Sequence, residues 1–231
     1  MSIYRNENDI TGYTPYGARA RDELDVAGEF FSRGGNGLAA FVLILPLDGG
    51  NALRPEILDQ ALEVEEKLST NFTMFNPATN QSESYREFCF SFCEINAPFV
   101  QFASSYIVQL SLAKSGAEIN DRIDLSYPIS TFYNRQINIQ PHFFGLEFGD
   151  NSVGPDVEEN STAIVKKTRI SNLKSVKMLS LQLRAERKKG WTTQMIKDFE
   201  LSITQYFERD FVSSHIRVLT LSPSYAEAEV R

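Results

Sequence analysis

The chain has 231 residues, of which 42% are hydrophobic and 12% aromatic; 23 basic side chains stand against 30 acidic ones, a formal net charge of −7. This length and apolar content predict a folded domain with a sizeable core and exclude a disordered chain. The acidic balance argues against a nucleic-acid binder, which needs a basic stripe. No apolar run reaches the roughly 20 residues of a membrane-spanning helix, so we expect a soluble fragment without membrane helices.

The N-terminal half begins with a predicted β–α–β unit. The continuous apolar segment 38–45 is typical of a strand buried on both faces. Residues 48–50 predict a turn, and Pro55 suits the first turn of a helix. Residues 71–75 then predict a short strand. The apolar face of the intervening helix carries Ile57, Leu58, Ala61, Leu62 and Leu68.

The C-terminal part repeats this plan. Residues 179–185 alternate apolar and polar side chains, as a half-buried strand does. Thr192 is the expected N-cap of a helix whose apolar stripe runs to about residue 209, and residues 216–221 predict a last strand. Two β–α–β units predict an α+β fold of the ferredoxin-like, split β-α-β type, with helices on one face of a four-stranded sheet.

The predicted domain organisation places an entry segment at residues 1–37 and the ferredoxin-like domain at 38–231, with an insertion at about 76–174. Because a structureless loop of that length is improbable, we expect the insertion to be ordered. It contains an aromatic-rich, strand-like stretch at 123–148, followed by a polar loop at 149–162. Before these, a helix is predicted from the apolar face formed by Phe99, Val100, Ala103, Tyr106, Ile107 and Leu110.

The motifs contain no recognisable catalytic constellation. The glycine-rich segment 34–37 precedes a strand, whereas a phosphate-binding loop follows one and brings Gly-Lys-Ser/Thr, so we interpret it as a turn. His142 and His215 lack a nucleophile or a partner at metal-ligand spacing, so we expect structural or surface histidines. The sequence therefore predicts a protein that is not an enzyme and has no metal or cofactor.

The two cysteines, Cys89 and Cys93, leave two interpretations open: two reduced core thiols, or a local disulfide in an oxidising compartment. A disulfide at this spacing needs a turn or a distorted helical turn, because an extended strand would put the Cα atoms beyond about 7 Å.

Three N-x-[ST] sequons occur, at Asn71, Asn80 and Asn160. Chance alone gives roughly two such matches in a chain of this composition, so the sequons by themselves are weak evidence for glycosylation. Asn80 and Asn160 lie in expected polar loops, which can accommodate a glycan, whereas Asn71 opens a predicted strand.

Several short motifs follow one another in a specific order. They are residues 12–21 with Glu29-Phe30-Phe31, residues 48–55 ahead of a helix, Cys89 and Cys93 followed by Asn96, residues 121–129, Gly190-Trp191, and residues 221–224. Together they resemble the first extracellular domain of Patched-related proteins, and the resemblance spans about residues 12–231. This family includes Patched, the Patched domain-containing proteins, Dispatched and the Niemann–Pick C sterol transporter, and is similar to bacterial resistance–nodulation–division pumps.

The resemblance implies a full-length protein with twelve membrane helices and two large extracellular domains with ferredoxin-like cores. The chain would be the first of these domains, excised from the extracellular or luminal face of a membrane protein of the plasma membrane or an endomembrane. The resemblance also implies transport of sterol or another lipid, with the ion-coupling and sterol-sensing segments in membrane helices that this chain lacks. We therefore expect a non-enzymatic domain that contributes to sterol or lipid binding and passage.

The alternative implied by the same family is a protein-interaction module that binds a secreted ligand, as Patched does with Hedgehog, or a partner domain. In either case the extracellular context favours a Cys89–Cys93 disulfide. It also favours glycans at Asn80 and Asn160, and a further one at Asn71.

Five aromatic residues crowd the expected insertion, which the ferredoxin-like core does not need. We expect about half of them to pack beneath the helix that carries Phe99 and Tyr106, on the usual burial of aromatic side chains. The others would face the second extracellular domain or a lipid passage, because large exposed apolar patches usually mark contact sites. The five residues are Phe132, Tyr133, Phe143, Phe144 and Phe148.

Overall fold

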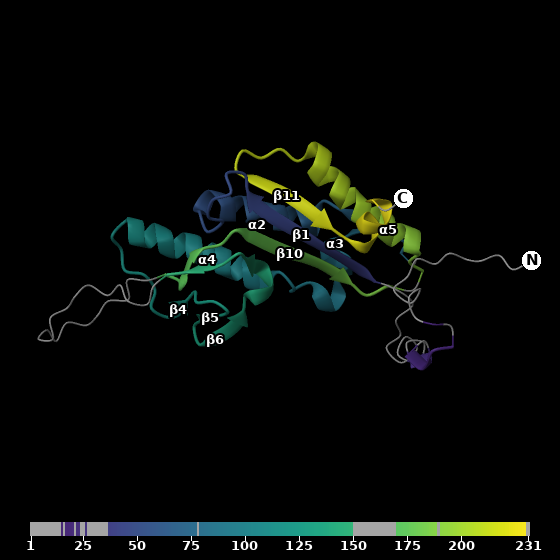
Figure 1. Cartoon of the computed structure of the whole chain (residues 1–231), viewed down its shortest axis with the longest axis horizontal. Coiled ribbons are helices and arrows are strands. Elements are labelled where there is room, and N and C mark those ends of the chain that lie inside the picture. Colours follow the sequence, from purple (N-terminus) through teal and green to yellow (C-terminus); the bar gives the residue numbers. More distant parts are fainter. Residues whose placement is uncertain are drawn as a thin grey trace, which may run out of the picture.

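The computed structural model describes residues 37–77, 79–149, 170–188 and 190–229, together with a few positions between 15 and 26. The chain has an α+β fold with several small antiparallel sheets (Figure 1). Most of the entry segment, the polar loop from residue 150 and the sequon at Asn160 lie outside the described residues.

The largest sheet has four antiparallel strands in the order β11-β1-β10-β7. In its centre Val42 pairs with Leu181 of β10, and Ile44 pairs with Val218 of β11. The first and third strands in the chain are therefore neighbours, and the last strand lies on the far side of the first. The strands are β1 (Leu38–Pro46), β7 (Phe143–Phe144), β10 (Met178–Ala185) and β11 (Ile216–Leu221).

Two helices cover one face of this sheet, α2 (Pro55–Thr70) and α5 (Thr193–Gln205). The buried side chains of β1 alternate along the strand, and Val42 and Ile44 are fully buried in the shared core. The Thr192 hydroxyl accepts a hydrogen bond from the Met195 amide and so caps α5, as the sequence predicts. One π-helical turn, Tyr206–Asp210, extends α5.

The strand expected at residues 71–75 does not join the main sheet. It is β2 (Thr73–Asn76), which pairs with β3 (Gln81–Ser84) in a separate hairpin. Asn80 takes a positive φ of 55° in the connection, a conformation that asparagine tolerates in tight turns, so the chain reverses at once and pairs locally. The two-residue strand β7, from within the expected insertion, occupies the sheet edge instead.

The described part of the expected insertion contains several small elements. Strands β4, β5 and β6 form a three-stranded sheet, and β8 pairs with β9. Figure 1 shows α4 and the β4–β6 sheet on the side of the main sheet that is away from β11. The elements are α3 (Tyr85–Phe88), a 3-10 turn (Phe90–Phe92), α4 (Ala97–Lys114), β4 (Ile123–Asp124), β5 (Ile129–Phe132), β6 (Arg135–Asn138), a 3-10 turn (Gln140–His142), β8 (Glu147–Phe148) and β9 (Leu173–Ser175). The last helix is α6 (Pro223–Glu229).

Side chains of the insertion substitute for a neighbouring strand along the outer edge of β10. The Asn96 amide donates to the Gln182 carbonyl and accepts from the Gln182 amide, both at 2.9 Å. The Tyr85 hydroxyl does the same for Arg184, at 3.0 and 3.1 Å. Because buried backbone groups left without partners are costly, these contacts anchor the insertion to the sheet.

None of the helices in the described ranges is long and apolar enough to cross a membrane.

Candidate functional site

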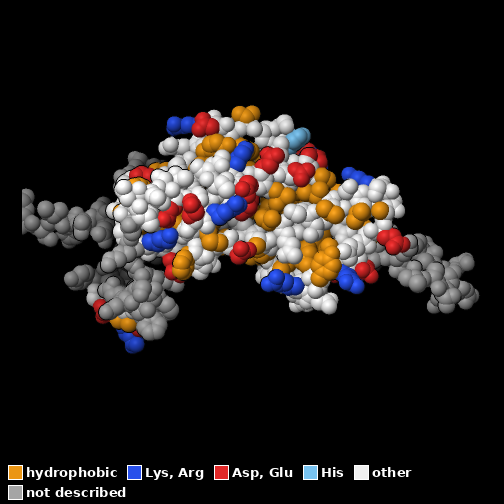
Figure 2. Space-filling model, turned by 180° about the vertical axis from the view of Figure 1, so that it is seen from behind, with side chains coloured by type: hydrophobic (Ala, Val, Ile, Leu, Met, Phe, Trp, Pro, Cys, Tyr) orange, Lys and Arg blue, Asp and Glu red, His pale blue; other side chains and the backbone are white. Residues whose placement is uncertain are grey.

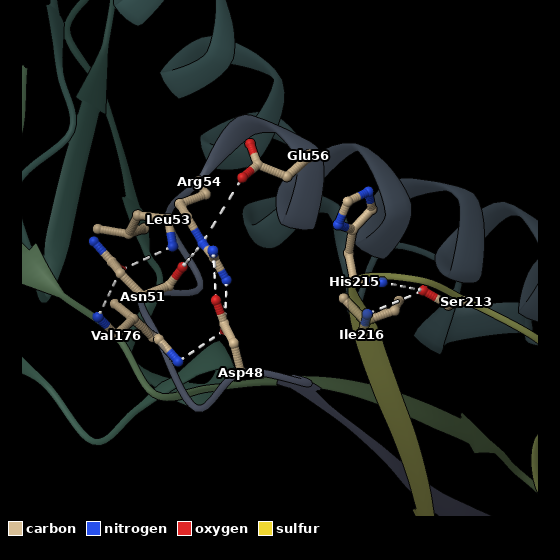
Figure 3. Close-up of polar contacts among 10 residues, drawn as sticks. Asp48, Asn51, Leu53, Arg54, Glu56, Val176, Ser213, His215 and Ile216 are labelled. Atoms are coloured by element: carbon tan, nitrogen blue, oxygen red, sulfur yellow. Dashed lines mark hydrogen bonds and ion pairs between the residues drawn. The ribbon is translucent and has the colours of Figure 1, made fainter.

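The loop between β1 and α2, which contains the motif at residues 48–55, is held in place by side-chain hydrogen bonds (Figure 3). The Asn51 side-chain oxygen accepts from the amides of Leu53 and Val176, at 2.9 and 3.1 Å. Its side-chain nitrogen donates to the Lys174 carbonyl at 3.0 Å. One asparagine therefore fixes the start of α2 against the β9–β10 connection.

The two histidines lie in different environments. The His142 ring is buried, and its Nδ1 lies 2.8 Å from the Ser180 carbonyl oxygen, so it too anchors the insertion to β10. Burial lowers the pKa of His142 from its ordinary value, against the opposing hydrogen bonds to the Ser180 and Ile95 backbone. His215 is exposed, and its backbone amide donates to the Ser213 hydroxyl at 3.0 Å (Figure 3).

A disulfide joins Cys89 and Cys93. Cys89 is buried at the end of α3 and Cys93 is exposed after the 3-10 turn, with 4.9 Å between their Cα atoms. Between them Phe90 takes a positive φ of 51°, so the chain makes the distorted helical turn that this spacing requires.

The two sequon asparagines within the described residues are both exposed. Asn71 follows the last residue of α2, and Asn80 lies in the turn between β2 and β3. An oligosaccharide attached at either side chain would extend into solvent. The third predicted position, Asn160, lies outside the described residues.

The five aromatic residues of the candidate contact surface divide into two groups. Phe132 and Phe143 are 4% and 2% exposed, and the Phe143 ring packs against Phe102 of α4 with centroids 4.8 Å apart. The other three are 61%, 43% and 55% exposed: Tyr133, Phe144 and Phe148. The exposed three come from the β5–β6 turn, β7 and β8, so they lie on the insertion rather than on the helical layer.

The main sheet has a second, apolar face that the sequence analysis did not single out. On β1 the side chains of Phe41, Leu43 and Leu45 alternate with the core residues and are half-buried. On β11 the exposed Leu219 and Leu221 pair directly with Leu43 and Phe41. These five side chains form the open apolar face. The Arg184 guanidinium lies 5.8 Å from the Phe41 ring, at the border of this face.

A cavity of about 470 Å³ lies where α2, α3 and α4 meet, with the disulfide in its wall. Seen from behind, hydrophobic side chains gather over the region of α2 and α4, next to acidic and basic side chains (Figure 2). Glu65 lines this cavity, although it falls four residues after Ala61 and seven after Leu58, on the apolar face of α2. A carboxylate on the apolar face of an amphipathic helix is the sequence feature that points to this cavity. The helical periodicity by itself did not single it out.

The described ranges contain no group of three or more His, Cys, Asp or Glu side chains placed to hold a metal ion. Searches against models of protein families, curated proteins and solved structures found no match to this chain.

Proposed function

We propose that the chain is a non-enzymatic extracellular or luminal domain of a Patched-related membrane protein that contributes to the binding and passage of a sterol or another lipid. The motif order described above supports this proposal, as does the disulfide, because disulfides persist in oxidising compartments. In the full-length protein, a second extracellular domain would be its structural partner.

The sheet order supports a ferredoxin-like assignment. The connection from β10 through α5 to β11 skips one strand, β1, and the connection from β1 to β7 skips β10. Two such split β-α-β connections with helices on one face define that architecture. The connection from β1 to β7 differs from the simple ferredoxin-like pattern, because β2, β3 and most of the insertion come between α2 and β7.

The open apolar face is the observation that carries the lipid-binding proposal. Strand β1 is apolar on both sides, and on this side its partners Leu219 and Leu221 of β11 are exposed. Exposed apolar surface of this kind usually marks a contact site, and a lipid needs an apolar wall with few polar groups. Arg184 and Arg217 lie at its border and offer polar contacts to a lipid hydroxyl or headgroup.

The test is binding of the fluorescent sterol dehydroergosterol to the 231-residue chain secreted from eukaryotic cells. We expect saturable binding that weakens about tenfold or more in the double variant Leu219→Ser/Leu221→Ser, since each leucine loses on the order of 1 kcal/mol of apolar contact. Val212→Ser, which removes an exposed apolar side chain from a loop, is the control and should bind as the parent chain does.

Absence of sterol binding, or equal binding by the double variant, would contradict the proposal. In the second case the sterol would lie elsewhere, and the three exposed aromatic side chains of the insertion would be substituted next.

A protein-interaction module is the second candidate, and the position of β11 favours it. This strand forms the edge of the sheet and pairs only with β1 among the described strands. A free strand edge can accept an extended segment of a secreted ligand or partner domain by adding one strand to the sheet. Co-purification of a secreted protein whose binding is lost in Val218→Pro, but retained in Leu219→Ser/Leu221→Ser, would favour this candidate over the lipid.

A further inference from the structure

On its α2 side, the cavity between α2, α3 and α4 is lined by the carboxylate residue Glu65 and by Ser69. Glu65 and Ser69 of α2 stand one turn apart, and the Ser69 hydroxyl donates to the Glu65 carboxylate at 3.1 Å. Ser69 is itself buried. Among the described residues no basic side chain pairs directly with Glu65, although the charge of Arg86 acts on its carboxylate.

Arg86 brings a basic side chain to the lining of the cavity. The Arg86 guanidinium, which also lines the cavity, donates to the Glu66 carboxylate at 2.7 Å. The remaining charged group in the lining is Glu94. The cavity therefore keeps an excess of negative charge, with Glu65 as its innermost carboxylate. Burial, and then the neighbouring charge of Glu66, raise the pKa of Glu65, against the opposing Ser69 hydrogen bond and the charge of Arg86. A cation bound in the cavity would stabilise the ionised carboxylate.

The opposite wall is apolar. Ala97 and Val100 of α4 line it, together with the Cys89–Cys93 disulfide. Gln101 and Ser104 of the same helix also line the cavity, and both have polar side chains with an oxygen atom. A volume of about 470 Å³ falls within the usual range for small-molecule sites.

We propose that this cavity binds a small organic ammonium ion with an apolar body, with Glu65 as its counter-ion. The ammonium group donates to the Glu65 carboxylate and to neighbouring side-chain oxygen atoms, and the apolar body lies against Val100 and the disulfide. This site is separate from the open face of the sheet, and goes beyond the lipid-binding role proposed above.

The experiment is an NMR titration of the ¹⁵N-labelled chain with benzylamine, and separately with benzyl alcohol, its neutral counterpart. We expect saturable shifts in amides of α2 and α4 with the amine, and binding about fivefold weaker or more with the alcohol, because the alcohol cannot pair with a carboxylate. Glu65→Gln should reduce amine binding to the level of the alcohol. Glu63→Gln, an exposed carboxylate on the same helix, is the matched control and should leave it unchanged.

No saturable shift at benzylamine concentrations up to about 10 mM would overturn the proposal, since that excludes any affinity of practical size. Equal binding of amine and alcohol by the parent chain would also overturn it, whether or not Glu65→Gln folds. Neither outcome bears on sterol binding, which is tested with substitutions on the opposite side of the sheet.

Discussion

Asp48 and Arg54 close the loop between β1 and α2 through two hydrogen bonds, each 2.7 Å long, from the guanidinium to the carboxylate. The Gly50 amide donates to the same carboxylate at 2.9 Å. The hydrogen bonds from Arg54, followed by the one from Gly50, lower the pKa of Asp48. The family-like motif at 48–55 therefore has a local structural explanation, independent of any ligand.

The first prediction compares two residues of this loop. Asn51→Ala should lower the free energy of unfolding by about 1–3 kcal/mol, because it leaves the Val176 amide without its acceptor and removes the bond to Lys174. Asp48→Asn should cost clearly less, because its pair with Arg54 is solvent-exposed. Urea unfolding followed by circular dichroism measures both, and a larger cost for Asp48→Asn would contradict this account.

The second prediction concerns pH. Burial lowers the pKa of His142 in the folded chain, so below the ordinary value of 6.5 the unfolded chain takes up the proton first. The free energy of unfolding should therefore be fully retained above that pH and decrease as the pH falls below it.

His142→Gln should remove this part of the pH dependence, at the cost of lower stability at neutral pH where the contact to Ser180 is weakened. His215→Gln is the control, since that side chain is exposed. Melting temperatures between about pH 7.5 and 5 measure the effect, and parallel curves for His142→Gln and the parent chain would contradict it.

The elements with regular periodicity could be predicted from the sequence almost to the residue. Strand β1, the helix from Pro55, and strands β10 and β11 all lie where alternation or helical spacing places them. Each of these patterns arises because one side of the element is buried in the core, so the local sequence is sufficient to predict the element.

The remaining features depend on contacts between distant residues. Nothing in residues 71–76 indicates whether the strand joins the main sheet or a local hairpin, since both need the same alternation. The side chains of Tyr85 and Asn96 hydrogen-bond to the backbone of β10, about 90 residues further along the chain. No periodic pattern in the sequence indicates these contacts. Glu65 breaks the apolar pattern of α2 for a reason that becomes visible only when α4 lies beside it.

The third prediction concerns Gly37, at the start of β1. A Cβ atom at this position would clash with the Ala185 carbonyl oxygen of the neighbouring strand, and a backbone atom cannot move aside as a side chain can. Gly37→Ala should therefore destabilise the chain by about 1–3 kcal/mol. Gly116→Ala, at an open position with a positive φ of 74°, should cost about 1 kcal/mol from backbone strain alone. Equal melting temperatures for the two variants would contradict the steric explanation.

The fourth prediction is glycan attachment at Asn71 and Asn80 when the chain passes through a secretory pathway, because both side chains are exposed. Intact mass before and after glycosidase treatment should show a loss for each occupied site. Asn71→Gln and Asn80→Gln should each remove one such loss, and the same assay covers Asn160. An unchanged mass in the parent chain would mean that the sequons are chance matches.

The last prediction concerns the Cys89–Cys93 disulfide. It closes a loop of only a few residues, so the chain-entropy relation gives a contribution of about 2 kcal/mol to the free energy of unfolding. Cys89→Ala/Cys93→Ala should lose about this amount, and a reducing agent should lower the melting temperature of the parent chain but not of the double variant. Alkylation followed by mass analysis should find no free thiol in the unreduced secreted protein and two after reduction. Two free thiols before reduction would contradict both the disulfide and the oxidising compartment that the proposed function requires.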